Sequence, residues 1–342
     1  MSQPLLHIDN LHVHFNTSDG VVQAINGASL TLNPGEIVGL VGESGSGKSV
    51  TAMSILGLVP KPPAVYPEGR ILWKGIDLLT TPDRELREIR GGEISMIFQD
   101  PMTSLNPVYT IGHQISEMIR VHERISAKAA KERSIEMLNL VGVPNPQQRV
   151  DDYPHQFSGG MRQRVMIAMA LMNSPRLLIA DEPTTALDVT VQAQILSLLD
   201  KLKKEFDMGV LLITHDLGVV AQVADRVSVM YAGQIVEEAP VDDLFYTPKA
   251  PYTLGLLKSV PRISANNERL KAIPGQPPSL INLPVGCPFA PRCEYKQHSS
   301  ESGCNSTKPE LIGTSATHRS RCHIPESLRH DLFAKELKEL QS

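Results

Sequence analysis

Residues 37–49 read IVGLVGESGSGKS, an apolar run that passes directly into a glycine- and serine-rich stretch ending in Lys48 and Ser49. The apolar part predicts a short buried strand, and residues 48–59 predict a helix. Between them the sequence fits the phosphate-binding pattern G-x-x-x-x-G-K-S/T, in the strand–loop–helix setting that this pattern requires. The alternative is a flexible glycine–serine turn, but the setting favours a nucleotide-binding loop, called here the P-loop (residues 42–49).

The P-loop pattern has a physical basis in phosphate binding. Glycines let successive backbone N–H groups curl around phosphate oxygens, and the start of the following helix adds the positive end of its dipole. Lys48 is expected to neutralise charge on the β- and γ-phosphates, and Ser49 to place its hydroxyl on Mg²⁺. The residues predicted to contact the nucleotide in this stretch are Gly42, Glu43, Ser44, Gly45, Ser46, Gly47, Lys48, Ser49 and Val50.

A pair of carboxylates follows a second apolar strand, in the sequence LLIADE at residues 177–182. Two acids at the end of a buried strand are costly unless they meet a cation. Asp181 is therefore predicted to bind Mg²⁺ at the carboxyl end of its strand, and Glu182 to act as the general base on the attacking water. An acid pair that only begins a helix is the alternative.

The composition is that of an ordinary globular protein. Of the 342 residues, 41% are hydrophobic and 20% are charged, which excludes disordered and fibrous classes. The net charge of −4 gives no electrostatic reason to expect a nucleic-acid partner. No stretch approaches the roughly 18–20 apolar residues of a spanning helix, and the first ten residues lack the layout of a signal peptide. We expect a soluble, cytosolic chain that meets a membrane only through a partner.

Strands and helices alternate along the first 240 residues. Further strands are predicted at residues 5–15, 27–32, 70–73, 93–98 and 210–214, and helices at about 111–143, 158–172 and 189–205. Fully apolar strands alternating with helices indicate an α/β fold with a parallel sheet covered on both faces.

A second candidate anion site lies at residues 157–164, FSGGMRQR. Ser158 is placed to cap a helix, and the glycines at 159 and 160 leave backbone N–H groups open to a phosphate. One nucleotide needs only one phosphate cradle in its own chain. The second cradle therefore suggests a nucleotide held between two chains.

With this element the sequence resembles the ABC ATPases, whose signature loop residues 157–164 match. Phe157 and Met161 depart from the commonest signature, but Ser158, Gly159 and Gly160 are kept. The resemblance implies a P-loop NTPase cassette with a RecA-like parallel sheet, an antiparallel β subdomain and an α-helical subdomain. It further assigns Gln99 to the glutamine loop and Mg²⁺, Asp188 to the D-loop, His215 to the γ-phosphate switch and Phe15 to stacking on adenine.

Singly, each of these residues has a plainer interpretation. Gln99 is then a surface amide, His215 a strand-end histidine and Phe15 a core residue at a strand end. Their order and spacing along one chain favour the ABC interpretation of all of them together.

Finer motifs resemble the D-type ATP-binding subunits of oligopeptide and dipeptide ABC importers. They are DPMTSLNP at 100–107, YPHQ at 153–156, PYT at 251–253, IPGQPP at 273–278 and GCPFAPRC at 286–293, within a resemblance that covers about residues 5–325. The resemblance implies ATP hydrolysis that powers import across a bacterial inner membrane, with this chain peripheral on its cytoplasmic face. It also implies a second ATPase subunit of the F type, two permeases that contact residues from 100 to about 124, and a solute-binding protein.

Other functions remain open at this stage. A same-family importer of nickel or another small solute would have a very similar ATPase. A soluble ABC ATPase of DNA repair or translation would be expected to carry a coiled coil or a second cassette, and a regulatory module would not need Glu182 and His215.

The sequence changes character near residue 240. Twelve of the 26 prolines lie between Pro240 and Pro325, which predicts a loop-rich module. The expected domains are a nucleotide-binding domain at 1–240 with its helical signature subdomain at about 100–172, a C-terminal module at 241–325, and a charged helical tail at 326–342 that is solvated.

All four cysteines lie in the C-terminal module, at Cys287, Cys293, Cys304 and Cys322. In a reducing compartment such a group favours a metal or cluster site over disulfides. The resemblance implies a [4Fe–4S] cluster, which takes four thiolates. Zinc, with His298, His318 or His323 as a substitute ligand, and four inert thiols are the alternatives. A cluster would hold together a module with little core of its own.

Overall fold

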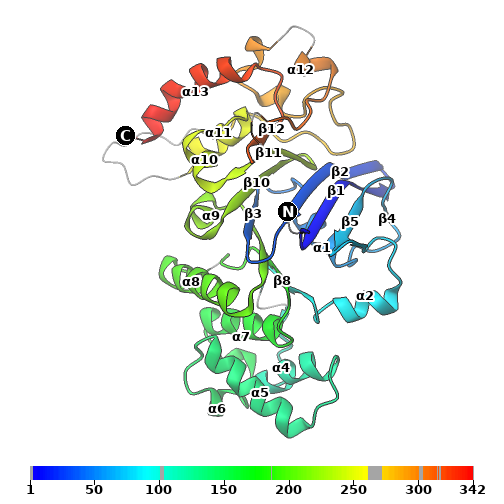
Figure 1. Ribbon diagram of the computed structural model, residues 1–342, viewed down its shortest axis with the longest axis vertical. Helices are drawn as coiled ribbons and strands as arrows, with labels where there is room; N and C mark the ends of the chain where they lie inside the picture. Colours follow the sequence, from blue (N-terminus) through cyan, green and yellow to red (C-terminus); the bar gives the residue numbers. More distant parts are fainter. Residues whose placement is uncertain are drawn as a thin grey trace. The chain divides into compact units, whose positions relative to one another are not determined.

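The computed structural model describes residues 3–100, 104–185, 187–260, 272–299, 303–313, 315 and 317–341. The chain forms two compact units (Figure 1). The first unit comprises Met1–Leu5, Leu32–Ile37 and Lys74–Ile213, and the second comprises Leu6–Thr31, Val38–Trp73 and Thr214–Ser342.

The second unit contains an antiparallel sheet from the N-terminal part of the chain. Its order is β2 (Gly20–Leu32), β1 (Leu6–Thr17) and β5 (Arg70–Trp73), with the short β4 (Ala64–Val65) paired to the far end of β1. Register places Leu6 opposite Trp73 and Phe15 opposite Ala64. Alternate residues of β1 are buried, which gives one apolar face for the core. The expected strand at 27–32 begins earlier, at Gly20.

A second set of strands in this unit carries the P-loop. Strand β3 (Ile37–Val41) pairs in parallel with β10 (Arg226–Tyr231), which pairs antiparallel with β11 (Gln234–Pro240), which in turn pairs with β12 (Arg319–Ser320). Every residue of β3 is buried, as expected of a strand covered on both faces. Helix α1 (Lys48–Ile55) follows the P-loop, and α9 (Leu217–Val223) precedes β10.

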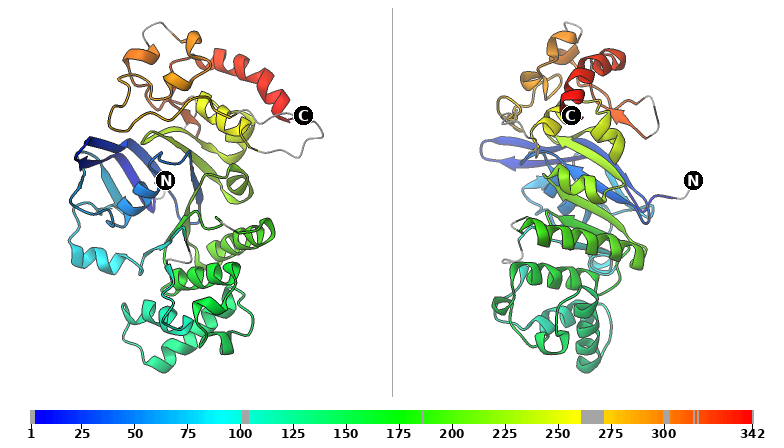
Figure 2. Two further views of the ribbon diagram at one scale, coloured as in Figure 1. Left: turned by 180° about the vertical axis from the view of Figure 1, so that it is seen from behind. Right: turned by 90° about the vertical axis from the view of Figure 1, so that its left-hand side faces the viewer.

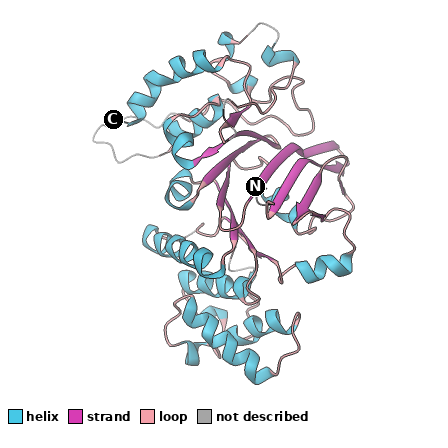
Figure 3. Cartoon of the chain, viewed as in Figure 1, coloured by secondary structure: helices cyan, strands magenta, loops and turns pink. Residues whose placement is uncertain are grey.

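The first unit combines parallel strands with a helical part (Figure 3). Strand β8 (Leu177–Asp181) lies between β7 (Ile94–Ile97) and β9 (Gly209–Thr214), and both neighbours run parallel to it. All residues of β8 and β9 are buried. The main helices are α4 (Ile111–Arg120), α5 (Ala127–Leu140), α7 (Gly159–Leu171) and α8 (Val189–Phe206). Shorter elements are β6 (Ile76–Asp77), α2 (Asp83–Ile89), α6 (Pro146–Arg149) and η1 (Pro154–Gln156).

The stretch predicted to be mostly helical, at about 111–143, contains two helices. They are α4 and α5, which pack against each other and against α7. Ser126 starts the second helix because its hydroxyl accepts a hydrogen bond from the N–H of Ala129.

The C-terminal part of the second unit consists largely of loops (Figure 2). Its helical pieces are α10 (Val241–Tyr246), α11 (Pro251–Lys258), η2 (Ala290–Arg292), η3 (Lys296–His298), α12 (Gly303–Ser306) and α13 (Glu326–Gln341). The predicted boundary near residue 240 falls between β11 and α10. Among the described residues, no helix is long and apolar enough to cross a lipid bilayer.

Helix α13 is not the solvated tail that the sequence suggested. Its Phe333 is only 1% exposed, and its ring lies 5.2 Å from that of Tyr295. Arg329 of the same helix is also buried and donates to the carbonyl oxygen of Lys249. The many charged residues of α13 suggested an exposed helix, because composition does not show that Phe333 and Arg329 face inward.

Candidate nucleotide site

The P-loop joins β3 to α1 in a conformation that requires glycine. Gly42 has φ 154° and Gly47 has φ 111°. A Cβ atom at Gly42 would lie 2.1 Å from the carbonyl oxygen of Met230, and one at Gly47 would lie 2.7 Å from that of Ala24. At Gly45, by contrast, nothing lies within 4 Å of where a Cβ would be, so the loop is open on that side. The loop is thus tightly packed at Gly42 and Gly47 and open at Gly45, which leaves room for a phosphate against its backbone N–H groups.

Two polar side chains line this loop. Lys48 is buried, and its Nζ donates to the carbonyl oxygens of Gly42 at 2.7 Å and Glu43 at 3.0 Å. The Oγ of Ser46 is buried and has no hydrogen-bond partner within the part of the chain that the structure describes. A buried hydroxyl without a partner is costly unless a ligand completes it. The loop therefore offers both a cation and a hydrogen-bonding group to an anion.

Glu43 is held by two residues that lie far along the chain. Its N–H donates to the hydroxyl of Tyr252 at 2.9 Å, and its carboxylate pairs with Arg292. This N–H is therefore already used, as is that of Ser46, which donates to the carbonyl oxygen of Glu43 at 3.2 Å. The side chains of Tyr252 and Arg292 were not among the predicted site residues, because they follow more than 200 positions later.

In the first unit, the predicted general base Glu182 is hydrogen-bonded to Gln99, the residue assigned to the glutamine loop. Gln99, just beyond β7, donates from Nε2 to Oε2 of Glu182 at 2.8 Å. The hydroxyl of Thr185 donates to the same oxygen at 2.9 Å, a contact that the sequence analysis did not anticipate. Glu182 has a left-handed backbone with φ 48°, and its N–H donates to the carbonyl oxygen of Ile213. Such backbone strain in a non-glycine residue is concentrated at functional sites.

Asp181 is the last residue of β8 and is buried at 5% exposure. It lies opposite Ile213 of the parallel neighbour β9. The carboxyl ends of parallel strands are where ligands of α/β sheets bind. The buried carboxylate lies at this end of β8, one residue before Glu182, and its binding of Mg²⁺ stays a prediction.

The residues of the second anion site have structural roles of their own. Ser158 caps α7 by accepting from the N–H of Met161, as predicted. A Cβ at Gly160 would lie 2.7 Å from a methyl carbon of Val191, so this glycine also lets α7 approach α8. Asp188 caps α8 by accepting from the N–H of Val191. Ala186, its neighbour in the predicted D-loop, lies outside the described residues, as do residues 101–103 of the predicted permease-contacting segment.

The two remaining predicted contacts lie in the second unit. His215 is exposed, in the turn between β9 and α9, next to Asp216, which caps α9. Phe15 is half-buried near the end of β1, beside β4. Its stacking on a base stays a prediction.

The four cysteines line one cavity in the second unit, together with aromatic side chains that include Tyr231, Tyr252 and Phe289. All four are free thiols, and the N–H of Cys287 donates to the carbonyl oxygen of Cys304. Burial raises the pKa of Cys287 to about 11 and that of Cys293 to about 12, and it also raises the pKa of Cys322. Across the described ranges, no three His, Cys, Asp or Glu side chains are grouped as ligands of a metal ion.

Comparison with known proteins decides the family. A profile of the ABC transporter family matches residues 25–185. The chain is 57% identical to the oligopeptide transport ATP-binding protein OppD of Bacillus subtilis, over 85% of this chain and 82% of that protein. The chain belongs to the ABC transporter ATP-binding family. It is thus an ABC ATPase, as the motifs predicted.

Three further matches extend this ABC ATPase assignment over the C-terminal segment. A profile described as the oligopeptide/dipeptide transporter C-terminal region matches residues 236–299. The dipeptide transport ATP-binding protein DppD of Bacillus subtilis is 51% identical and aligns with 98% of this chain and 100% of its own length. OppD of Salmonella typhimurium is 52% identical, over 89% of each chain.

Solved structures agree on the cassette fold. The dimeric structure of the bacterial ABC transporter cassette MJ0796 has a TM-score of 0.62 and 29% identity, and it covers 69% of this ABC ATPase and 98% of that chain. The cbiO1 protein of Clostridium perfringens has a TM-score of 0.61 and 27% identity, over 72% of this chain and 92% of its own. The predicted ABC cassette fold is confirmed, whereas none of these matches supports a metal-binding or cluster-binding C-terminal module.

Proposed function

We propose that this ABC ATPase hydrolyses ATP to power the import of oligopeptides or dipeptides. The observation that carries the proposal is the 51–57% identity to the OppD and DppD proteins, which continues through the C-terminal segment that matches the oligopeptide/dipeptide transporter region. In this role the chain works with two permeases, a solute-binding protein and a second ATPase, for which an F-type paralogue is the candidate. Its place is the cytoplasmic face of the bacterial inner membrane.

The site residues take the following roles in this proposal. Backbone N–H groups of the P-loop and Lys48 bind the phosphates, while Ser49, Gln99 and Asp181 serve Mg²⁺. When bound, Mg²⁺ neutralises charge that develops on the transferred phosphoryl group. Glu182 takes a proton from the attacking water, and His215 contacts the γ-phosphate.

The contacts of Glu182 support its role as base. Gln99 and Thr185 both donate to Oε2, which fixes the orientation of the carboxylate. The strained backbone at Glu182 is held by its N–H bond to Ile213.

The second anion site completes the nucleotide site of a partner chain. Ser158 uses its side chain to cap α7, so the helix begins with backbone N–H groups at Gly159 and Gly160. In the proposal these groups bind the γ-phosphate of a nucleotide held by the partner ATPase, and Asp188 lies at the same interface. The partner's equivalent loop closes the P-loop of this chain.

Replacing the base tests the catalytic assignment directly. Glu182→Gln keeps the size of the side chain but cannot accept a proton. ATP turnover is expected to fall by roughly 10²- to 10⁴-fold, the range for a general base, with ATP binding retained. Glu205→Gln, an exposed change on α8, is the matched control and should keep normal turnover. Near-normal hydrolysis by Glu182→Gln would rule out this residue as the base.

We further propose that the four cysteines hold a [4Fe–4S] cluster. Thiolates are the ligands of such clusters, and all four thiols line the same cavity. Zinc requires four ligands close around one point, with Zn–S distances near 2.3 Å. Zinc, with a histidine as a substitute ligand, is the alternative for these thiols. His318, a candidate zinc ligand, is already bound to Glu237 at 2.8 Å.

A further inference from the structure

Arg292 forms a buried, two-pronged ion pair with the P-loop. Its Nη1 lies 2.6 Å from Oε2 of Glu43, and its Nη2 lies 3.0 Å from Oε1. The Arg292 side chain is only 4% exposed, while that of Glu43 is 28% exposed. Bidentate arginine–carboxylate pairs are strong and directional, so this contact fixes the plane of the Glu43 carboxylate.

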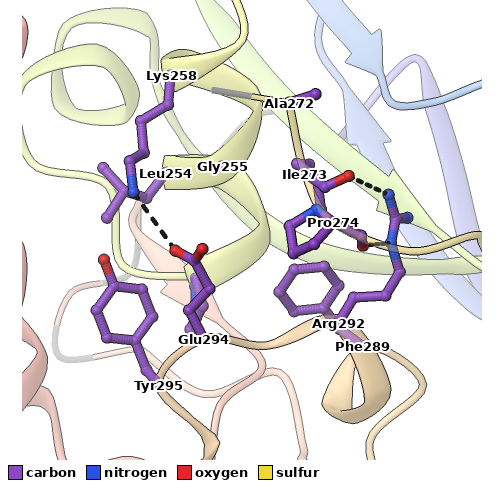
Figure 4. A pocket seen from close by; sticks show the side chains of 11 residues that line it. Leu254, Gly255, Lys258, Ala272, Ile273, Pro274, Phe289, Arg292, Glu294 and Tyr295 are labelled. Carbon is purple, nitrogen blue, oxygen red and sulfur yellow. Dashed lines mark hydrogen bonds and ion pairs between the residues drawn. The ribbon is translucent and has the colours of Figure 1, made fainter. Parts of the chain in front are cut away.

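Arg292 is itself held rigidly by its surroundings. Its Nε donates to the carbonyl oxygen of Pro274 at 2.9 Å and its Nη2 to that of Ile273 at 3.4 Å (Figure 4). On another side, its guanidinium lies 5.8 Å from the ring centre of Tyr231. The guanidinium is therefore already oriented without a ligand. Pairing with Glu43 costs it little further side-chain conformational entropy.

A second contact from the C-terminal segment reaches the same residue. The hydroxyl of Tyr252, in α11, accepts the N–H of Glu43. Tyr252 is 1% exposed, and its ring packs 4.5 Å from that of Tyr231 and 5.3 Å from that of Phe289. Both the backbone and the side chain of Glu43 are thus held by residues that follow it by more than 200 positions.

The charge of Glu43 explains why such an anchor matters. A carboxylate in a phosphate-binding loop repels the nucleotide, and repulsion in a partly buried site is weakly screened. Arg292 supplies the opposite charge at hydrogen-bonding distance. Lys258 also lines the cavity of about 200 Å³ beside Arg292, but it pairs with Glu294 (Figure 4) and with Glu336.

We propose that Arg292 is a positioning residue for ATP, which neutralises Glu43 and holds the P-loop ready for the triphosphate. The C-terminal segment, on this account, sets the nucleotide affinity of the cassette. The inference rests on the P-loop being the ATP site. It adds to the proposed function because it assigns a nucleotide-related task to a residue outside the cassette motifs.

Binding of ATP to the 342-residue chain in the presence of Mg²⁺ tests the proposal. Arg292→Met removes the charge and leaves Glu43 unpaired, so the Kd for ATP should rise about tenfold or more, with a smaller rise for ADP, which carries less charge. Adding Glu43→Gln removes the repelling carboxylate. The double variant should therefore bind ATP within about threefold of the wild type.

Three controls separate this role from a merely structural one. Arg329→Met also removes a buried arginine of the second unit, but one bonded to Lys249 and Ser320, and it should lower thermal stability without a specific loss of ATP affinity. Arg292→Lys keeps the charge but loses the two-pronged contact, so its ATP affinity should lie between that of the wild type and that of Arg292→Met. Glu43→Gln alone should bind ATP at least as tightly as the wild type, and it serves if Arg292→Met does not fold.

The outcomes are distinct. Unchanged ATP affinity in Arg292→Met, or a double variant as weak as the single one, would overturn the proposal. A tenfold loss in Glu43→Gln alone would also overturn it. Failure of the wild-type chain to bind ATP would instead contradict the proposed function, so the two failures can be told apart.

Discussion

Two independent constraints allow only glycine at position 47. Its φ of 111° is unfavourable for any residue with a Cβ, and a Cβ would lie 2.7 Å from the carbonyl oxygen of Ala24. Gly45 shares the first constraint, with φ 76°, but has nothing within 4 Å. The two positions therefore form a matched pair within one loop.

Alanine substitutions separate backbone strain from steric clash. Gly45→Ala is expected to lower the free energy of unfolding by about 1–2 kcal/mol, the cost of a left-handed backbone. Gly47→Ala should cost clearly more, because the clash adds to the same strain. Denaturant unfolding of the nucleotide-free variants measures both changes. Equal losses would contradict the steric account of Gly47.

Single residues could be proposed from the sequence where their chemistry is local. The P-loop glycines, Lys48 and Glu182 could be found because a short pattern encodes backbone conformation and charge together. The pair of Arg292 and Glu43 could not, because a contact across 249 positions leaves no periodicity in the sequence. Thr185 was missed for a different reason, since a threonine near an acid is too common to signal a hydrogen bond.

Among helices and strands, buried polar residues help to explain where the structure differs from the sequence-based prediction. No strands were predicted at β10 and β11. In β11, Glu237 and Glu238 interrupt the apolar pattern of a strand that is in fact buried. Glu237 accepts from the N–H groups of Lys249 and Ala250 and pairs with His318. Glu238 pairs with Arg226 and Arg319. These partners are distant along the chain, so the sequence did not reveal that the acids are compensated.

Helix α13 allows a direct test of packing. Phe333→Ala removes a ring that is 1% exposed, and it is expected to cost up to about 3–5 kcal/mol in the free energy of unfolding. Leu328→Ala, on the same helix at 36% exposure, should change it by less than about 0.5 kcal/mol. Thermal unfolding of the two variants gives the comparison. Similar small effects would mean that α13 is the solvated tail that its composition suggested.

At the scale of the whole molecule, the C-terminal segment is anchored at several points along the second unit. Strand β12 pairs with β11, Tyr252 and Arg292 hold Glu43, and the cysteine cavity lies among the same aromatic rings. A cluster bound by the four thiols would brace this loop-rich segment, since metal binding can supply folding free energy that a small core does not.

Metal analysis of anaerobically purified protein tests the cluster. We expect about four irons per chain and a broad absorption band near 400 nm, with loss of both in Cys293→Ser. Removal of the iron should lower thermal stability. A content of one zinc per chain would contradict the cluster and indicate a single-ion site. A metal-free protein of unchanged stability would mean that the four thiols are inert.

In the proposed function, ATP hydrolysis by this chain drives peptide uptake. The most direct measurement is accumulation of a labelled oligopeptide by vesicles that contain the assembled importer, with its solute-binding protein outside and ATP inside. Uptake should require ATP and should be abolished by Glu182→Gln in this chain. Peptide accumulation that continues undiminished with the Glu182→Gln subunit, or ATP-driven uptake of another solute but not of peptide, would contradict the account.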